Sequence, residues 1–230
     1  MRNRSVATAA AVLTLGALLS AGSAAAAAPT CADLDATQVE QVCQILRSDP
    51  GYRVDLSFPA TYPDAEALHD YVRQTRDGFL NVAQTPDARS RPYALEMRAR
   101  EYGAAVGPRD TRSVVLETYE DVGGPRAATF YKTFTWDNGL REPVTIDTLF
   151  RPDVEPFPVL RALVQGEVSK QFGAAEPIPA GAGLDPRAYQ NFALTDDALI
   201  FFFDRGALLA ETAGVFEVSL PRTAVGPLLA

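Results

Sequence analysis

The chain has 230 residues, of which 47% are hydrophobic and 22% are charged. These values are ordinary for a folded globular protein and exclude an intrinsically disordered chain. Its 21 basic and 29 acidic residues give a net charge of −8, and a surface of that sign repels nucleic acid phosphates and anionic lipids. Nucleic acid and membrane surfaces are therefore not expected partners.

The N-terminus has the pattern of a secretory signal peptide. Arg2 and Arg4 form a positive start, residues 6–22 are uncharged and mostly apolar, and residues 23–28 offer several Ala-x-Ala cleavage positions. A membrane anchor is the alternative, but it needs roughly 20 apolar residues and a charged flank. We expect residues 1–27 to be removed, which leaves 21 − 2 = 19 basic residues against 29 acidic ones. The mature chain is then predicted to be secreted, extracellular and not inserted in a membrane.

The chain contains only two cysteines, Cys31 and Cys43. In an exported protein a lone pair of cysteines forms a disulfide by default, and closing a loop of this size stabilises the fold by about 3 kcal/mol. A metal or redox pair is the alternative, but the two cysteines do not form a CxxC motif and His69 is the only histidine. The sequence therefore predicts a structural disulfide close to the mature N-terminus.

The first half of the mature chain mixes helical and strand patterns. Residues 33–46 have a partial apolar face and predict a short helix, whereas residues 52–58 alternate between apolar and polar and predict a half-buried strand. Residues 65–82 repeat apolar side chains at helical spacing, with Asp64 at the N-cap position. They predict the clearest helix of the chain, and residues 93–99 predict a second alternating strand.

The middle of the chain predicts a hairpin and a second helix. Residues 113–119 and 128–136 are rich in strand formers and flank a Gly-Gly-Pro turn, so they predict an antiparallel pair. Residues 137–139 mark a further reversal of the chain. A helix begins at Pro156, and the Gly-, Ala- and Pro-rich residues 173–183 predict a loop after it.

The last part of the chain returns to strands. Residues 191–195 and 198–203 predict a hairpin that turns at Asp196 and Asp197, and residues 215–220 predict another strand. The run 198–203 carries large apolar side chains on both faces, so both faces must be covered in a soluble protein. We therefore place this hairpin at the centre of a sheet.

Together these elements predict an α+β fold, in which two main helices pack on an antiparallel β-sheet that carries an N-terminal disulfide. Glycine and proline cluster at residues 103–109. We expect an N-terminal subdomain of residues 28–108 and a C-terminal domain of residues 109–230, or else one compact unit of residues 28–230.

The sequence offers few candidates for catalysis. A serine or cysteine nucleophile needs a histidine base, and His69 on the predicted long helix has no nucleophile motif beside it. Asp196 and Asp197 could be paired carboxylates of a glycoside hydrolase, but a turn explains them without catalysis. A zinc ion needs three or four suitable ligands, which one histidine and two bonded cysteines do not supply. We predict no catalytic residue, no metal and no cofactor, and a protein that is not an enzyme.

Two surfaces are candidates for binding a partner. Positive charge concentrates in six arginines, Arg89, Arg91, Arg98, Arg100, Arg109 and Arg112. Arg98 and Arg100 share the polar face of one predicted strand and could hold an anionic glycan or an acidic protein segment, although interspersed acidic residues favour a self-compensated face. Phe202 belongs to an aromatic set that could line a groove, but large aromatic side chains are mostly buried.

Several short motifs resemble one protein family. They are Ser48-Asp49-Pro50-Gly51-Tyr52, Tyr62-Pro63-Asp64, Gln74-Thr75-Arg76-Asp77 followed by Phe79-Leu80, and Gly183-Leu184-Asp185-Pro186 followed by Tyr189-Gln190-Asn191-Phe192. Over nearly the whole mature chain they resemble the secreted immunogenic proteins of mycobacteria and related actinobacteria, the MPT/MPB-type antigens. The C-terminal half also resembles, more loosely, the extracellular domain of RsiV-type anti-sigma factors, a domain class associated with lysozyme sensing. The resemblance implies a secreted α+β protein with a paired N-terminal cysteine bridge and a C-terminal domain of undefined biochemical role, and it brings no catalytic residues.

These observations predict a secreted, non-enzymatic antigen-type protein that acts as a monomer and binds host or cell-envelope components. The alternative is a sensor or inhibitor of a lysozyme-type hydrolase, in which the acidic chain binds a basic partner protein. Under both hypotheses the partner is a protein or an envelope component, and no cofactor is required.

Overall fold

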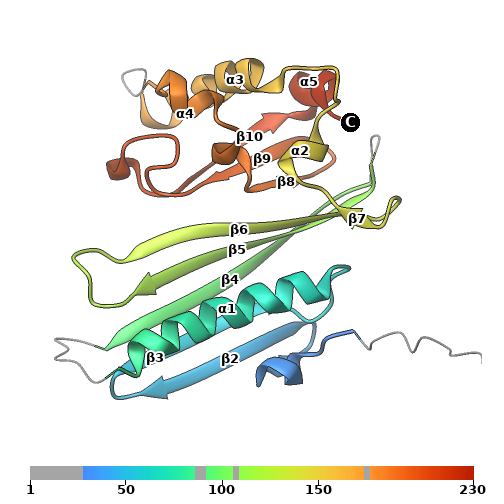
Figure 1. The fold of residues 1–230 in the computed structure, drawn as a ribbon. Coiled ribbons are helices and arrows are strands. Elements are labelled where there is room, and N and C mark those ends of the chain that lie inside the picture. Colours follow the sequence, from blue (N-terminus) through green and yellow to red (C-terminus); the bar gives the residue numbers. More distant parts are fainter. Residues whose placement is uncertain (1–27, 86–91, 106–108, 174–176) are drawn as a thin grey trace, which may run out of the picture.

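The computed structural model describes residues 28–85, 92–105, 109–173 and 177–230, so the expected signal peptide lies outside the described residues. Two sheets organise the described chain (Figure 1). The first contains, in spatial order, β1 (Thr37–Val39), β2 (Val42–Asp49), β3 (Tyr52–Pro59), β4 (Tyr93–Ala104), β5 (Thr111–Asp121), β6 (Ala128–Asp137) and β7 (Glu142–Pro143). The second contains β10 (Phe216–Pro221), β9 (Ala198–Phe203) and β8 (Phe192–Leu194).

The helices are shared between the two sheets. The α-helices are α1 (Ala65–Ala83), α2 (Ile146–Leu149), α3 (Pro156–Phe172), α4 (Ala180–Leu184) and α5 (Arg222–Val225). The 3₁₀ turns are η1 (Cys31–Leu34), η2 (Pro186–Tyr189), η3 (Glu211–Ala213) and η4 (Gly226–Leu228). Figure 1 shows α3 and α4 over the three-stranded sheet and α1 beside β3 and β4, at the opposite end of the molecule.

The helix α1 connects the only parallel pair among the described strands, β3 and β4, in which Val54 lies opposite Leu95. A parallel pair needs a crossover connection, and an amphipathic helix between the strands provides one. The side chain of Asp64 accepts a hydrogen bond from the Ala67 amide at 3.3 Å and so caps the first turn. The predicted helix and its N-cap are therefore confirmed.

The segment 33–46 was predicted to be a helix, and this prediction is wrong. Asp35 ends the 3₁₀ turn η1 in the left-handed region with a φ of 53°, after which the chain forms β1 and β2. Cys43 and Ile45 are both buried, and they are two residues apart, which is the spacing of one face of a strand. The pairing of β2 with β3 therefore decides the local conformation, rather than the partial helical pattern.

The predicted disulfide is confirmed. Cys31 and Cys43 are bonded, with their Cα atoms 5.4 Å apart. Both side chains are buried and belong to the hydrophobic cluster beneath α1, together with residues such as Leu56, Val72 and Phe79. The bond thus attaches η1 to the second strand of the large sheet.

The hairpin of β8 and β9 is confirmed, and β9 is the central strand of the three-stranded sheet. Phe201 and Phe203 point into the cluster that contains the buried face of α3. Phe202 points the other way, into a small cluster with Val115 of β5 and Tyr131 of β6. Both faces of β9 are therefore covered, as the apolar run predicted.

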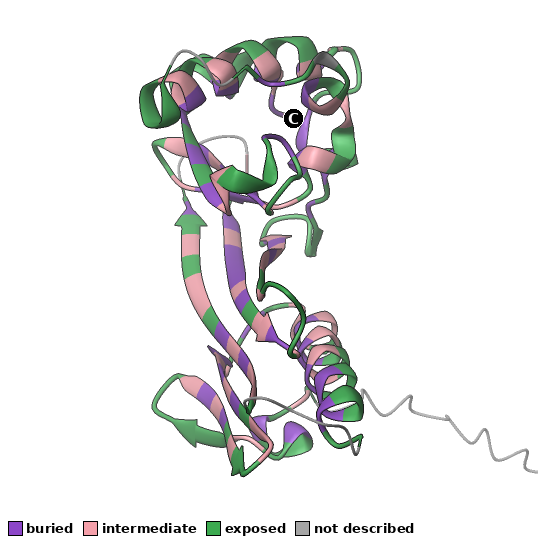
Figure 2. Cartoon of the chain, turned by 90° about the vertical axis from the view of Figure 1, so that its left-hand side faces the viewer, coloured by how far each residue is buried: buried purple, intermediate pink, exposed green. Residues whose placement is uncertain are grey.

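The two sheets pack face to face around this small cluster. Along β5, Val114 and Leu116 belong to the cluster beneath α1, whereas Val115 between them belongs to the cluster with Phe202. Figure 2 shows buried, intermediate and exposed residues along the long strands that join the two ends of the molecule. The central strands of the large sheet are therefore buried on both faces where β8 and β9 lie against them.

The predicted α+β class, with largely antiparallel pairing, two main helices and an N-terminal disulfide, is confirmed. One detail differs, because α4 begins at Ala180, within the region 173–183 that is predicted to be a loop. The division at residues 108 and 109 stays a prediction. Within the described residues, the hydrophobic side chains form one large cluster beneath α1 and another around the three-stranded sheet.

Candidate functional site

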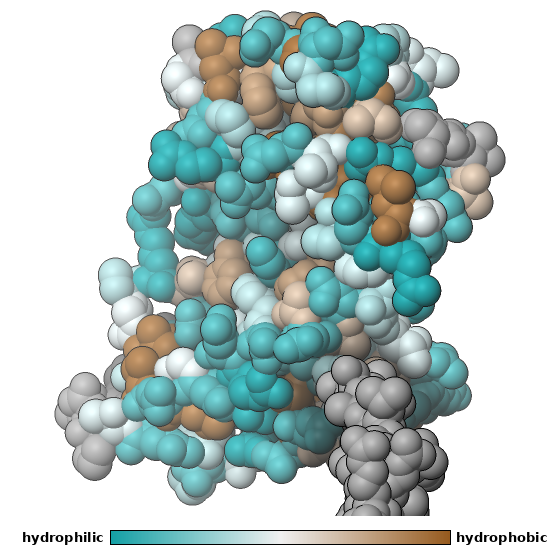
Figure 3. All heavy atoms as spheres, turned by 45° about the vertical axis from the view of Figure 1, so that its right-hand side comes forward, coloured by the Kyte–Doolittle hydropathy of each residue, from teal (hydrophilic) through white to brown (hydrophobic). Residues whose placement is uncertain are grey.

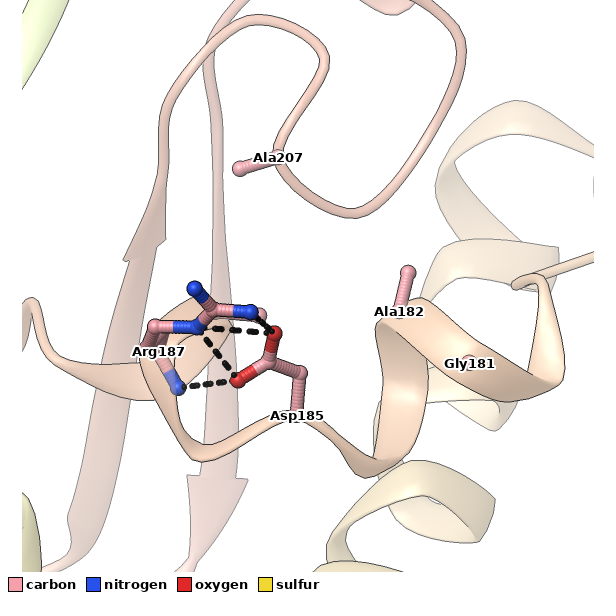
Figure 4. A pocket seen from close by; sticks show the side chains of 6 residues that line it. Gly181, Ala182, Asp185, Arg187 and Ala207 are labelled. Atoms are coloured by element: carbon pink, nitrogen blue, oxygen red, sulfur yellow. Dashed lines mark hydrogen bonds and ion pairs between the residues drawn. The ribbon is translucent and has the colours of Figure 1, made fainter.

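One pocket of about 430 Å³ lies between α4, η2 and the loop that follows β9 (Figure 4). We call it the Arg187 pocket, and its lining consists of Gly181, Ala182, Asp185, Arg187, Ala188 and Ala207. The hydroxyl of Tyr189 donates to the carbonyl of Gly183 at 2.9 Å, which fixes α4 against η2. Burial raises the pKa of Tyr189 to about 12, so this hydroxyl stays protonated and remains a donor at neutral pH.

The charges of the Arg187 pocket neutralise each other. Asp185 accepts hydrogen bonds from the Arg187 side chain, at 2.8 Å from one terminal nitrogen and at 3.1 Å from Nε, and also from the Arg187 backbone amide at 2.9 Å. These hydrogen bonds lower the pKa of Asp185 below its ordinary value. Asp185 is therefore a poor proton acceptor, and the lining of this pocket includes no hydroxyl group.

A second pocket of about 250 Å³ lies where β6, the start of α2 and the start of β8 meet. We call it the Lys132 pocket, and its lining consists of Lys132, Thr133, Val144, Thr145, Ile146, Asp147, Gln190 and Phe192. The space-filling view shows hydrophobic side chains in small groups among hydrophilic ones where the upper and lower parts of the molecule meet (Figure 3). Pockets between packed units are common positions for ligand sites.

Backbone contacts fix both walls of the Lys132 pocket. On one wall, the Thr133 hydroxyl oxygen accepts a hydrogen bond from the Phe192 amide at 3.1 Å, which ties β6 to β8. On the other wall, the Val144 amide donates to the Thr135 carbonyl at 2.8 Å. The Thr145 amide donates to the Thr148 hydroxyl at 3.0 Å, which caps the start of α2. The groups at the pocket are therefore held by secondary structure.

The Lys132 pocket combines charged and polar groups that do not neutralise each other. The Lys132 ammonium lies 5.4 Å from the centre of the Phe134 ring, and among the described residues it forms no ion pair with a carboxylate. Asp147 is exposed. Gln190 also lines the pocket and carries a side-chain amide. The Asp147 carboxylate also forms no ion pair within the described parts of the chain. A cation, a carboxylate and an amide donor are groups that can stabilise charge and transfer protons in hydrolysis.

The arginines predicted as a partner surface are paired with acidic residues. Arg98 lies 2.9 Å from the carboxylate of Asp55, and Arg100 lies 2.8 Å from that of Glu217. Partial burial of Asp55 opposes ionisation, but hydrogen bonds from Arg98 and Arg53 outweigh it and lower the pKa of Asp55. These ion pairs agree with the expectation that acidic residues on the same face neutralise the charge of the arginines. Arg89 and Arg91 lie outside the described residues.

Phe202 is not available to a partner, because only 1% of the residue is exposed. Its ring lies between those of Tyr102 and Tyr131, at centroid distances of 5.9 and 5.4 Å. The guanidinium of Arg100 covers it at 5.2 Å. The choice of Phe202 as a candidate for a partner surface is therefore wrong, and the alternative expectation that Phe202 packs in the core agrees with the structure.

The two remaining catalytic candidates lie in neither pocket. His69 is 2% exposed and packs edge-on against Phe58, with ring centres 5.5 Å apart. The carboxylate of Asp196 accepts a hydrogen bond from the Ala105 amide at 2.7 Å, so it ties the β8–β9 turn to the end of β4. Both observations agree with structural roles. No helix in the described parts of the chain is long and apolar enough to cross a membrane.

The amino-acid sequence and the fold can be compared with those of known proteins. Over 215 residues the chain is 46% identical to the immunogenic protein MPT64 of Mycobacterium tuberculosis and to MPB64 of Mycobacterium bovis, with 93% of this chain and 94% of theirs aligned. The chain belongs to the MPT64 family of immunogenic proteins. The resemblance of the short motifs to this family is thereby confirmed.

Another protein similar in sequence to this chain is named as an enzyme. Over 206 residues the chain is 43% identical to the protein named esterase Rv3036c of Mycobacterium tuberculosis, with 89% of this chain and 91% of the relative aligned. This finding corrects the prediction that the chain is not an enzyme. The prediction was based on the absence of a histidine-centred catalytic motif, and that criterion does not detect hydrolases that use other groups.

The C-terminal part of this MPT64-family chain also matches a family described only as a protein of unknown function. The match to this family, DUF3298, covers residues 147–223. The crystal structure of a DUF3298 protein from Pseudomonas aeruginosa aligns with a TM-score of 0.53 at 12% identity and covers 82% of this chain and 94% of that protein. At that identity the likeness shows the fold alone.

Sequence reasoning assigned no functional role to the residues of either pocket, although Asp185, Gln190 and Phe192 lie in motifs that carry the family resemblance. Lys132 is one of only two lysines in the chain, with Lys170, and it interrupts an aromatic strand pattern. Asp147 follows a predicted reversal of the chain, where a carboxylate is unremarkable. Arg187 lies beside the Gly183–Pro186 motif that carries part of the family resemblance. A signal existed for Lys132, but the pocket that it lines together with Asp147 depends on the packing of β8 against β6.

Proposed function

We propose that this protein is an extracellular esterase whose reaction takes place in the Lys132 pocket. The observation that carries the proposal is the 43% identity to a protein named an esterase over 89% of this chain. The free charges of the Lys132 pocket support this choice over the Arg187 pocket, in which the carboxylate is already occupied. An extracellular location agrees with the signal-peptide pattern at the N-terminus.

The proposed reaction uses a water molecule as the nucleophile. Asp147 accepts a proton from this water, and the water oxygen attacks the carbonyl carbon of the ester. The carbonyl electrons move to its oxygen, and the amide of Gln190 stabilises the resulting oxyanion together with the ammonium of Lys132, which has to turn from its position 5.4 Å from the Phe134 ring centre to reach it. The oxyanion then collapses, the bond to the alcohol oxygen breaks, and the departing alkoxide takes the proton from Asp147.

A direct attack by water agrees with the other side chains of the pocket and the chain. The Thr133 hydroxyl already accepts a hydrogen bond from Phe192 and donates to the Gln190 carbonyl at 3.5 Å, so it is held in place and is not a free nucleophile. The only histidine of the chain is buried, and both cysteines form the disulfide. A carboxylate base therefore remains the best candidate for activating water.

The test is hydrolysis of p-nitrophenyl butyrate by the purified, disulfide-bonded mature chain. We expect saturable release of p-nitrophenol above the buffer rate. Lys132→Met should lower kcat by about 100-fold, because it removes one donor to the oxyanion. Lys170→Met is the matched control and should retain the parent rate, since Lys170 is exposed and pairs with Glu167 on α3.

Two results would overturn the proposal. One is a rate equal to the buffer rate with p-nitrophenyl esters of both short and long acyl chains. The other is a wild-type rate in Lys132→Met, which would place any esterase activity outside this pocket. Binding to a host or cell-envelope protein stays a prediction, as does the monomeric state.

A further inference from the structure

We propose that the Arg187 pocket binds an acetamido group, that is, a neutral amide carbonyl that carries a methyl group. This site goes beyond the proposed esterase site, because the linings of the two pockets share no residue. The proposal rests on a guanidinium held in a fixed orientation, on the neutral charge of the site and on the small size of the walls.

The guanidinium of Arg187 is held in place but keeps a free donor. Nε and one terminal nitrogen of Arg187 donate to Asp185, while no hydrogen bond from the other terminal nitrogen occurs within the described residues. Figure 4 shows this remaining nitrogen pointing away from Asp185, toward the side of the pocket where Ala207 lies. A side chain already fixed by a bidentate contact loses little further freedom when it binds a ligand.

The charge of the site favours a neutral acceptor. Asp185 and Arg187 form an ion pair at 2.8 Å, so the pocket carries no net charge. An anionic ligand at the free nitrogen would gain attraction from Arg187 and experience repulsion from Asp185. A neutral carbonyl oxygen accepts the hydrogen bond without this repulsion, and an amide carbonyl is a stronger acceptor than an ester carbonyl.

The walls of the pocket suit a methyl group. Apart from the ion pair, the lining consists of one glycine and three alanines, Gly181, Ala182, Ala188 and Ala207. No side chain among these four is larger than a methyl group, so a ligand methyl can approach the backbone of α4 and of the loop after β9. The volume of about 430 Å³ exceeds that of an acetamido group alone, so this group would belong to a larger molecule.

The acetamido group can come from an N-acetylated sugar or from an N-acetylated peptide, and the experiment separates the two. The probes are N-acetylglucosamine and N-acetylalanine methylamide, each titrated into the ¹⁵N-labelled mature chain and followed by NMR shifts of residues 181–188. Glucose and alanine methylamide, which lack the acetyl group, are the matched probes. Acetate tests whether negative charge alone is recognised.

We expect saturable shifts with at least one acetylated probe and none with the matched probes or with acetate. Arg187→Ala should weaken this binding at least tenfold, and Ala207→Leu should abolish it by filling the pocket. Arg151→Ala removes an exposed arginine that lies 3.7 Å from Asp153, outside the pocket, and should leave the affinity unchanged. The two pocket variants should fold, because the Arg187 side chain is 84% exposed and Ala207 is also exposed.

The inference is overturned by any of four results. They are no saturable shift with either acetylated probe, binding of acetate in preference to the acetylated probes, equal binding of acetylated and non-acetylated probes, and an unchanged affinity in both Arg187→Ala and Ala207→Leu. A response to the sugar alone or to the peptide alone supports the site and identifies its source.

Discussion

At the scale of single residues, Asn191 shows how the edge of β6 is protected. Its side-chain oxygen accepts from the Thr133 amide at 3.2 Å, and its side-chain nitrogen donates to the Tyr131 carbonyl at 3.1 Å. The carboxylate of Asp204 accepts from the Tyr131 amide at 2.6 Å. An exposed strand edge is a template for unwanted pairing, and these two side chains occupy the backbone groups that such pairing would use.

We predict that Asn191→Ala destabilises the protein by about 1–3 kcal/mol, because it leaves two partly buried backbone groups of β6 without partners. Urea denaturation followed by circular dichroism measures this change. Asn138→Ala is the control, since the Asn138 side chain contacts Asp110 at an exposed position, and it should cost no more than about 0.5 kcal/mol. Equal losses in the two variants would show that Asn191 does not secure this edge.

The residues of the disulfide could be predicted from the sequence, and those of the candidate site could not. The bond between Cys31 and Cys43 could be predicted because the chain has only two cysteines and its expected compartment is oxidising. Lys132 and Asp147 needed the three-dimensional arrangement, because they lie on β6 and α2 and line one pocket only through the packing of β8. The burial of Phe202 could be predicted from its place in a run of large apolar residues.

At the scale of elements, local patterns succeeded where they agreed with tertiary packing. The helix α1 has both a clear apolar face and an N-cap, and the structure confirms it. The segment 33–46 has only a partial apolar face, and pairing with β3 outweighs that preference. Short elements such as α2 and α4 are determined by packing against neighbours, and their sequences carry too few turns for a periodic signal.

The burial of His69 on α1 predicts that the stability of the protein depends on pH. Burial lowers the pKa of His69, and Arg73 lowers it further, while Asp33 and Asp70 partly oppose this. The folded state therefore disfavours the protonated imidazole relative to the unfolded chain, whose histidine pKa is about 6.5. Stability from His69 is fully present above that value and is lost as the pH falls toward the pKa of the folded state.

We expect His69 to lower the free energy of unfolding as the pH falls from 7.5 to 5.5, because burial lowers its pKa in the folded state. Urea denaturation at the two pH values measures the loss, and His69→Leu should remove most of this pH dependence while keeping an apolar side chain against Phe58. If His69→Leu shows the same pH dependence as the parent, other groups are responsible and the account of His69 is wrong.

At the scale of the whole molecule, the two sheets are joined by the small cluster around Phe202. This ring packs between Tyr102 and Tyr131, so it links the central strand of the small sheet to the large one. We predict that Phe202→Ala costs about 3–5 kcal/mol, because it leaves a cavity between the sheets. Thermal unfolding should show the loss, whereas Leu46→Ala, at a residue that is 68% exposed, should stay close to the parent. A parent-like melting curve for Phe202→Ala would mean that the cluster does not join the sheets.

The overall class could be predicted from alternating strands and two amphipathic helices, but the division into two sheets could not. Nothing in the pattern of residues 191–220 distinguishes strands that extend a sheet from strands that form a second one. The distinction arises from the side chains of Asn191 and Asp204, which occupy the edge of β6 that an added strand would need. The pocket at Lys132 is a consequence of that arrangement.

The comparison of Asp147→Asn with Asp153→Asn in p-nitrophenyl butyrate hydrolysis tests the proposed esterase site most directly. Both aspartates are exposed, but only Asp147 lines the Lys132 pocket. We predict that Asp147→Asn lowers kcat by about 100-fold or more through loss of the general base, while Asp153→Asn keeps the parent rate. Parent-like hydrolysis by Asp147→Asn would contradict the proposed mechanism.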